Sequence, residues 1–205
     1  MIEKIKNNGH EFVDLGLPSG TLWSTCNVGA SNPSDFGLYF QWGDVQGYSK
    51  EEIKAGKKKF SFHWDDYKWN PSGDGETFTK YNTPKDARLE LEDDAAHVHM
   101  GGFWHMPSSE QIQELINETT SNWIKLDNVN GRLFTSKNGK SIFIPAAGIA
   151  WDGSVRYSGV DGYVWSSMLD VTYVDSGQGL LFYSGYVNLF SDDRYIGLPV
   201  RGIIG

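Results

Sequence analysis

The acidic and histidine residues between positions 92 and 105 have the side-chain types that bind metal ions. Residues 92–94 are Glu-Asp-Asp, His97 and His99 follow, and His105 lies shortly beyond. If this stretch is a strand, the alternating histidines point to one face, and zinc accepts imidazole and carboxylate ligands. No Cys or His follows His105, so a closed zinc site is hard to complete. We therefore expect exposed or helix-capping histidines and no bound metal.

Two further stretches could do chemistry, and each has a simpler interpretation. Residues 192–194, Asp-Asp-Arg, could hold calcium in a loop, but we favour a self-paired surface cluster. Cys26 is the only cysteine, which excludes an internal disulfide, and we expect it to be a small buried apolar residue. The HExxH, P-loop, GxSxG and dinucleotide-binding motifs are absent. The sequence thus predicts a protein that is not an enzyme and has no cofactor.

Composition limits the classes of partner. The 205 residues suffice for one domain with a full core, and a net charge of −8 argues against nucleic acid and anionic membranes. No apolar run approaches the roughly 18 residues of a membrane helix, so we expect no membrane insertion. Residues 1–9 lack the apolar stretch of a signal peptide. This indicates either a cytoplasmic protein or a trimmed sequence.

The first two thirds of the chain contain clear local signals. Residues 12–23 read as two strands around a Pro-Ser-Gly turn. Ser49 and Glu52 form a capping box for a helix that we expect to reach about residue 59, and residues 60–94 read as a long loop. Ser108 and Gln111 begin the clearest helix, whose apolar stripe is Ile112, Leu115 and Ile116.

Short strands dominate the rest of the chain. We expect them at residues 123–126, 132–136, 141–144, 163–167, 180–184 and 198–203, with a two-residue Asn-Gly turn at 138–139 that places both residues at positive φ. In the 180–184 strand, Leu180, Phe182 and Ser184 should face the core, while Leu181 and Tyr183 face outward. The fold class is therefore α+β with few helices, and we expect Trp23, Trp104, Trp123 and Trp165 in its core.

The last 61 residues, 145–205, use a restricted set of residue types. They contain no Lys and no Glu but keep six Asp and three Arg, whereas residues 1–144 hold all 13 Lys and all 10 Glu. A segment that avoided charge would have lost Asp and Arg as well. The restriction therefore acts on residue type rather than on polarity.

Several motifs along the chain resemble one family. A large paralogous domain family of gut bacteria and their phages is similar at residues 13–23 (VDLGLPSGTLW), 104–108 (WHMPS), 145–148 (PAAG), 165–167 (WSS) and 200–201 (VR). That family resembles the C-type-lectin fold of the formylglycine-generating-enzyme type. The variable proteins of diversity-generating retroelements, which include phage major tropism determinants, use the same form. In them, adenine-directed mutagenesis rewrites a C-terminal region that forms a ligand-binding face on an invariant scaffold.

The resemblance implies a single C-type-lectin-like domain over residues 1–205, with a scaffold at 1–144 and a variable region at 145–205. Mutating both adenines of AAC codons gives NNC codons, which cannot encode Lys, Glu, Gln, Met or Trp. The restricted residue types of the variable region fit this mechanism. Residues outside the NNC set must be fixed by the template, and they are Trp151, Trp165, Met168 and Gln178.

The function that the resemblance implies is ligand binding, as a receptor-binding or adhesin protein. The partner is a protein or glycan on a target cell surface, and the location is a phage virion, or a cell surface if the sequence is trimmed. Tyrosines supply rigid contacts, Ser and Gly adapt around them, and Asp makes the surface acidic. The candidate ligand-binding residues are Ile149, Trp151, Asp152, Arg156, Tyr157, Asp161, Asp170, Tyr173, Asp175, Leu181, Tyr183, Tyr186, Leu189, Asp192, Asp193 and Tyr195.

Two other functions are open alternatives. The formylglycine-generating oxidases resemble copper enzymes with a pair of active-site cysteines, and this chain has only Cys26. Calcium-dependent sugar lectins use a Glu-Pro-Asn or Gln-Pro-Asp loop and a Trp-Asn-Asp strand, which this chain lacks. Calcium-independent carbohydrate binding, by stacking of sugars on tyrosines or on Trp151, is therefore the main alternative to protein binding.

Overall fold

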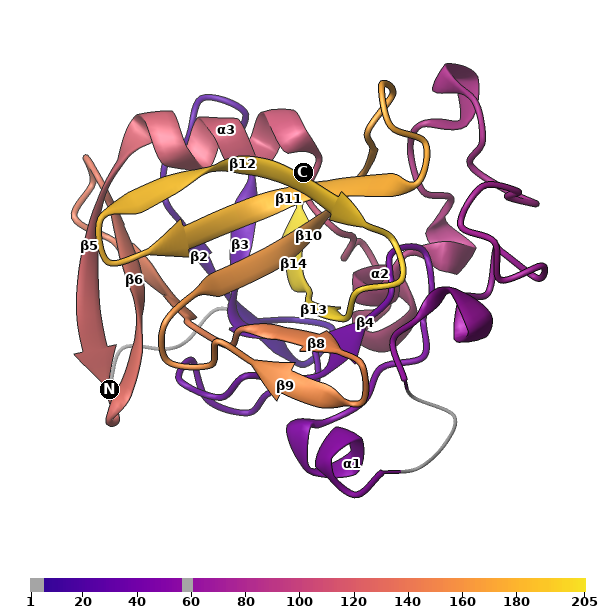
Figure 1. Ribbon diagram of the computed structural model, residues 1–205. Helices are drawn as coiled ribbons and strands as arrows, with labels where there is room; N and C mark the ends of the chain where they lie inside the picture. Colours follow the sequence, from indigo (N-terminus) through magenta and orange to yellow (C-terminus); the bar gives the residue numbers. More distant parts are fainter. Residues whose placement is uncertain (1–5, 57–60) are drawn as a thin grey trace.

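The computed structural model describes residues 6–56 and 61–205, and over this range the chain forms five small antiparallel sheets (Figure 1). One sheet joins the two ends of the chain, in the order β1 (Lys6–Asn7), β2 (His10–Asp14), β3 (Leu22–Asn27) and β14 (Arg201–Ile204). The second contains β5 (Thr119–Leu126), β6 (Val129–Ser136) and β7 (Ser141–Pro145), and the third contains β10 (Gly162–Leu169), β11 (Ser176–Tyr183) and β12 (Tyr186–Asp193). Two strand pairs complete the set: β4 (Tyr39–Phe40) with β13 (Leu198–Pro199), and β8 (Ile149–Trp151) with β9 (Ser154–Arg156).

Helices are few and short, so the class is α+β with mostly small antiparallel sheets, as predicted. The α-helices are α1 (Lys50–Lys54), α2 (Ala95–Met100) and α3 (Ser109–Glu118). Residues 61–94 follow an irregular path interrupted by single 3₁₀ turns at η1 (Trp64–Asp66), η2 (Pro84–Asp86) and η3 (Leu91–Asp93). The predicted long loop is therefore confirmed over its described part, and residue 60 lies outside the described residues.

Both predicted capping boxes are present. The Ser49 hydroxyl accepts from the Glu52 amide while Glu52 accepts from the Ser49 amide, and Ser108 and Gln111 make the same reciprocal pair. Helix α1 ends at Lys54, earlier than predicted, and residues 57–59 of the expected helix lie outside the described residues. In both helices the cap satisfies backbone N–H groups that have no acceptor inside the helix.

The turn between β6 and β7 differs from the prediction. Gly139 has a φ of +80°, but Asn138 is not among the residues with positive φ. The Gly139 amide donates to the Ser136 carbonyl, and the Asn138 side-chain oxygen accepts from the Lys140 amide at 2.9 Å. The connection is thus a longer turn in which only the glycine adopts the left-handed conformation, because the Asn138 side chain bonds the local backbone.

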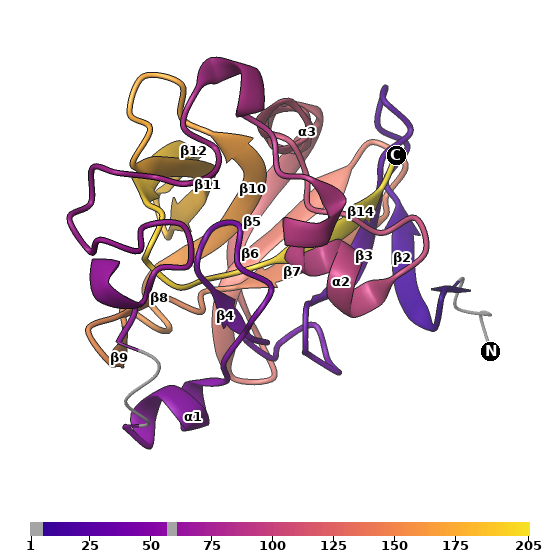
Figure 2. The same cartoon turned by 90° about the vertical axis from the view of Figure 1, so that its right-hand side faces the viewer.

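Helix α3 lies across one face of the β10–β11–β12 sheet and beside β5 and β6, as Figure 1 and Figure 2 show from two sides. Neighbouring residues of β10 enter different cores because strand side chains alternate between faces. Val164 joins Ile112 and Leu115 of α3 in one core. Trp165 joins Trp104 in a second core on the other side of the sheet.

The four tryptophans predicted to be buried divide unequally. Trp23, Trp104 and Trp165 are fully buried, which confirms the prediction for them. Trp123 is only half-buried, because it lies on β5, the edge strand of its sheet, and contacts the Phe182 ring at a centroid distance of 6.4 Å.

Three buried arginines connect distant segments by donating to backbone oxygens. Arg201 of β14 donates to Ser24 O of β3 and to Phe143 O of β7, at 2.9 and 3.0 Å. Arg132 of β6 and Arg194, which follows β12, act in the same way. Burial lowers the pKa of all three guanidinium groups. These contacts fix the C-terminal third of the chain to the rest.

Replacement of Trp165 by alanine tests this packing. The Trp165 indole stacks on the Phe190 ring with 6.1 Å between the ring centroids. Its Nε1 donates a hydrogen bond to the Phe40 carbonyl oxygen at 2.9 Å. We expect Trp165→Ala to lower the free energy of unfolding by about 3–5 kcal/mol in urea denaturation. Phe103→Ala is the control, because Phe103 is 75% exposed and its loss should change stability by at most about 0.5 kcal/mol. Equal midpoints for the two variants would contradict the described core.

Candidate ligand-binding surface

The β10–β11–β12 sheet turns one face toward α3 and the other away from it. In β11, Leu180 and Phe182 are buried, whereas Leu181 is half-buried and Tyr183 is 41% exposed. This confirms the predicted alternation for these four residues. The prediction that Ser184 faces the core is wrong, because β11 ends at Tyr183 and Ser184 lies in the exposed turn that follows.

The register extends the second face across all three strands. Tyr163 pairs with Leu181, which pairs with Asn188, and Tyr183 pairs with Tyr186. We define the outer face as the side chains of this parity that reach solvent: Tyr163, Leu181, Tyr183, Tyr186, Asn188, Phe190 and Asp192. Sequence reasoning missed Tyr163, Asn188 and Phe190. Their place on this face follows from strand pairing, which a single strand's alternation does not reveal.

A pair of stacked tyrosines marks one end of the outer face. The Tyr183 and Tyr186 rings lie 5.1 Å apart at an interplanar angle of 14°. Beneath the turn that joins them, the buried Arg132 guanidinium donates to the Tyr183 carbonyl at 2.7 Å and to the Ser184 carbonyl at 3.4 Å. The tyrosine pair is therefore held on a backbone that is fixed to the scaffold.

Exposed apolar side chains concentrate in this part of the chain. Among the described residues, nine large hydrophobic side chains are exposed, and six of them lie between positions 157 and 186: Tyr157, Val160, Val171, Tyr173, Tyr183 and Tyr186. In the antiparallel order β10–β11–β12, the connection before β10 and the β11–β12 turn lie at the same end of the sheet, while the β10–β11 loop lies at the other (Figure 1). Tyr157, Val160, Tyr183 and Tyr186 thus share one end with the outer face. Clustered exposed apolar groups are typical of interaction surfaces.

The β8–β9 hairpin lies below β10 in Figure 1, and Ala150 of β8 pairs with Gly197, which directly precedes β13. The Arg156 guanidinium lies over the Trp151 ring at 4.3 Å, and its Nη2 is 3.7 Å from Asp152 Oδ2. Tyr157 follows the hairpin and interacts electrostatically with Tyr163 of the outer face. The structure therefore brings Trp151, Asp152 and Arg156 together on the hairpin and places Tyr157 near the outer face.

Two carboxyl groups on this surface are partly desolvated. Burial raises the pKa of Asp192 to about 6, and the neighbouring charge of Asp193 adds to this, while the Asp193 amide opposes it. Burial alone raises the pKa of Asp161. Both acids interact with Tyr163, whose own pKa burial raises to about 12. Within the described chain, no salt bridge involves either acid.

The predicted residues Asp170, Tyr173 and Asp175 lie in the β10–β11 loop, at the other end of the sheet. Asp170 Oδ1 accepts from the Thr172 and Tyr173 amides, and Oδ2 accepts from the Ser191 hydroxyl at 2.6 Å. Burial acts to raise the pKa of Asp170, but these hydrogen bonds outweigh it and hold the pKa below its usual range. A short Asp side chain suits such local contacts, which is a structural reason for Asp in this segment.

Four other predicted residues do not belong to the outer face. Ile149 and Tyr195 are only 7% and 9% exposed and pack in the core, so their placement on a binding surface was wrong. Leu189 has the opposite parity to Asn188 and packs beside the core under α3. Asp193 has that parity too, and its carboxyl lies near Tyr195 and Asp175, with a pKa raised by burial.

The predicted self-paired cluster at residues 192–194 does not form. The Arg194 side chain is fully buried and donates from Nη2 to Tyr81 O at 2.8 Å and to Val174 O. Its guanidinium also lies 4.0 Å from the centre of the Phe78 ring. Arg194 therefore anchors the end of β12 to the 61–94 segment, and the two aspartates are left without it as a partner.

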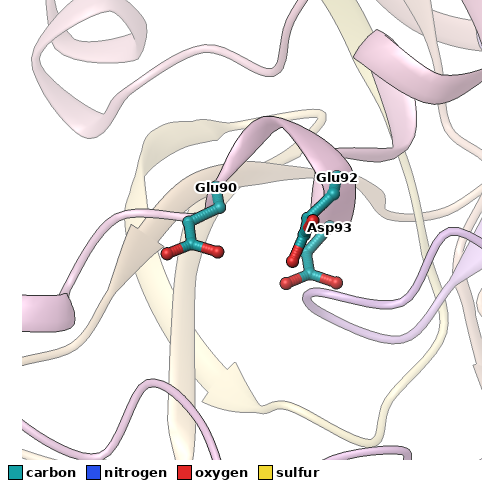
Figure 3. Close-up of side chains that lie close together, drawn as sticks. All are labelled: Glu90, Glu92 and Asp93. Atoms are coloured by element: carbon teal, nitrogen blue, oxygen red, sulfur yellow. The ribbon is translucent and has the colours of Figure 1, made fainter.

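The histidines near residue 97 belong to helix α2, so they do not alternate on a strand as the zinc interpretation assumed. His97 and His99 bond different carbonyls, Trp104 O and Val45 O. Three acids nearby do converge, and Figure 3 shows them: Glu90, Glu92 and Asp93. The Lys80 ammonium already lies within 2.6–3.3 Å of all three carboxylates, so it neutralises the cluster where a metal ion would bind.

A cavity of about 550 Å³ lies away from the outer face, between α1 and the loop that precedes β4. Phe36, Leu38, Lys50 and Val129 are among its lining residues. None of the predicted ligand-binding residues lines it. The exposed members of the predicted set instead occupy an open surface, which suits contact with a large partner.

Comparisons with protein-family models, with curated proteins and with solved structures give no match. The geometry of the surface is therefore the basis for assigning function. None of the helices within the described residues is long and apolar enough to cross a membrane.

The raised pKa of Asp192 predicts that Asp192→Asn stabilises the protein at neutral pH. The folded state binds this proton more tightly than the unfolded chain, so wild-type stability falls as pH rises through about 6. We expect Asp192→Asn to increase the free energy of unfolding by about 1–3 kcal/mol near pH 7.5 and to give little change near pH 4.

Asp74→Asn is the control, because it should change the free energy of unfolding in the opposite direction. Hydrogen bonds from Asn70, Thr77 and Glu76 lower the pKa of Asp74, so that variant should lose stability near pH 7.5 and lose less at low pH. Urea denaturation across this pH range measures both. Destabilisation by Asp192→Asn at neutral pH would contradict the described environment of Asp192.

Proposed function

We propose that this protein is a non-enzymatic ligand-binding protein of the receptor-binding or adhesin kind, and that the outer face with the adjoining β8–β9 hairpin is its binding surface. The observation that carries the proposal is the concentration of exposed large apolar side chains between residues 157 and 186. An enzyme site typically encloses its substrate in a concave pocket, whereas this surface is open and aromatic. Tyrosine-rich open surfaces are typical of protein recognition.

Preorganisation supports the proposal. Tyr183 and Tyr186 are stacked on each other, and Arg132 fixes the carbonyls of the turn between them. Tyr163 rests edge-on against Phe190, which in turn stacks on the buried Trp165. Rings that are already ordered lose little entropy when a partner binds.

We further propose a C-type-lectin scaffold of the formylglycine-generating-enzyme type, in which residues 145–205 vary. The sequence resemblance is the basis, and the burial of its motif residues supports it. Trp23, Trp104, Trp165 and Arg201 are all buried, so the shared motifs are structural. The exposed residues between these motifs are the ones free to change without loss of the fold.

Carbohydrate binding without calcium is the second candidate, and the stacked Tyr183 and Tyr186 rings favour it. Exposed aromatic rings are platforms for sugar rings as well as for protein side chains. Trp151 is less suited, because Arg156 covers its ring. A glycan array, with and without a chelator, separates this candidate from calcium-dependent sugar binding.

Variability predicts a gene arrangement. The gene should lie near a reverse transcriptase and a near-copy of its own 3′ end. In that copy, Asn codons should stand at many of the exposed positions of the variable region, including Asp152, Tyr157, Asp161, Tyr173, Tyr183 and Tyr186. Sequencing of the flanking DNA tests this. Differences between the copies at bases other than adenine would remove the proposed variability and leave the binding surface standing.

Binding predicts the effect of a triple substitution. The probes are peptides selected on the wild-type protein from a random-dodecapeptide display library, or glycans that bind on the array. We expect these probes to lose binding to the triple variant Leu181→Ala, Tyr183→Ala, Tyr186→Ala. We expect each aromatic truncation to cost about 1–4 kcal/mol of binding free energy.

The control is Tyr173→Ala, a more exposed tyrosine at the other end of the sheet. Ligands should bind this control as they bind the wild type, and thermal unfolding should show that both variants remain folded. Selected ligands that bind the triple variant with unchanged affinity would refute the proposed surface.

A further inference from the structure

The charge of the proposed binding surface points to the chemistry of its partner, and this step rests on the proposed function. Asp161 and Asp192 are half-buried carboxyl groups whose ionised forms burial disfavours. Asp192 Oδ1 accepts only from the adjacent Asp193 amide, at 3.0 Å, and the described residues offer neither acid an ion pair. A partly desolvated carboxylate without a cation is unfavourable, and a cation supplied by a partner would relieve it.

Asp93, a buried acid elsewhere in the fold, has cationic partners. Lys68 and Lys80 bind it at 2.8 and 2.6 Å and Tyr81 donates to it at 2.7 Å. Burial acts to raise the pKa of Asp93, and these partners outweigh it and lower the pKa below its usual range. Asp93 therefore has cationic partners, whereas the described residues give Asp161 and Asp192 none.

Among the described residues, the basic side chains beside this surface are already engaged. Arg156 lies on Trp151 and near Asp152, and Lys50 of α1 donates to the Ser158 hydroxyl at 3.0 Å while lying over the Phe36 ring. His63 packs against Tyr195 and lies 3.8 Å from Asp65. The segment 145–205 supplies no lysine. With six Asp and three Arg, this segment carries a net negative charge.

Tyrosine rings lie near each of these acids, which the strand register places toward opposite ends of the sheet: Asp161 precedes Gly162, whose partner is Phe182, and Asp192 pairs with Gly177. Tyr163 interacts with both Asp161 and Asp192, and the exposed Tyr157, Tyr183 and Tyr186 lie toward the same end of the sheet as Asp161. Tyrosine faces attract guanidinium and ammonium groups, and the hairpin already shows this preference in the Arg156–Trp151 contact. Carboxylates and ring faces together form a combination that recognises arginine or lysine side chains.

We propose that the outer face binds a cationic protein segment, with arginine or lysine side chains of the partner between Tyr163 and the carboxylates of Asp161 and Asp192. The partner is an exposed basic loop or strand. Its apolar side chains contact Leu181 and the tyrosine pair, and its positive charge meets the uncompensated acids. Electrostatic complementarity of this kind selects partners and speeds their association.

A hexa-arginine peptide is the probe. It is titrated by calorimetry, and by NMR of the labelled protein, into the wild type, into Asp161→Asn, Asp192→Asn, and into the charge-matched control Glu76→Gln, Asp86→Asn. The control residues are exposed and lie in the 61–94 segment. A hexa-glutamate peptide tests the sign of the interaction.

We expect hexa-arginine to shift the amide signals of the outer face and hexa-glutamate to leave them unchanged. The dissociation constant should rise about tenfold in Asp161→Asn, Asp192→Asn and less than about twofold in the control. Binding should also weaken from near pH 7.5 to near pH 5, as Asp192 gains a proton. Equal weakening in both double variants would show attraction to an acidic protein in general and would overturn the inference.

The dodecapeptides selected on the wild type separate this inference from the proposed function. Peptides that require Tyr183 and Tyr186 and are rich in arginine or lysine support both. Peptides that require these tyrosines but carry no positive charge keep the binding surface and overturn the cationic partner. Peptides that bind the triple variant of the outer face unchanged overturn both.

Discussion

Hydrogen bonds from buried guanidinium groups to backbone carbonyls are the interaction on which the rest of the structure depends. Arg132, Arg194 and Arg201 lie in the interior, and their described partners are carbonyl and side-chain oxygens of neutral groups. Each spans segments far apart in sequence, and together they fix the turn after β11, the end of β12 and strand β14. A buried charge whose acceptors were removed would strongly destabilise the fold, so these contacts enforce one arrangement of many short strands.

The stability of this scaffold explains how the protein tolerates surface groups that lower its free energy of unfolding. Asp192 and Asp161 are half-buried and have no ion pair among the described residues, and exposed tyrosines lie in the same part of the chain. Such groups lower stability, which a scaffold with large aromatic cores can tolerate. Groups that cost the fold and lie together on one open surface indicate selection for binding rather than for stability. The face of the β10–β11–β12 sheet that turns away from α3 therefore has two roles: Trp165 packs there in a core, and the side chains of the same parity that reach solvent form the outer face.

Local sequence signals predicted the local structure and the alternation of one strand. The two capping boxes, the strands on either side of Asn138-Gly139, and the parity of Leu180 to Tyr183 depend on neighbouring residues only. The predictions that were wrong concern residues whose positions depend on contacts distant in the sequence. Arg194 was predicted to pair with Asp192 and Asp193 but donates to the Tyr81 carbonyl, more than a hundred residues away in the sequence. Tyr195 was predicted to be on the binding surface but is buried in the core. Tyr163, Asn188 and Phe190 joined the outer face through strand register, which no local pattern contains.

The central claim is that the outer face is where a partner binds. The most direct measurement is amide hydrogen exchange of the protein alone and in complex with a peptide selected on the wild type. The account predicts that protection on binding concentrates in β11, β12 and the connection before β10, with the largest change around Tyr183 and Tyr186. Protection confined to the cavity near Phe36, or to the surface around Phe103, would contradict it.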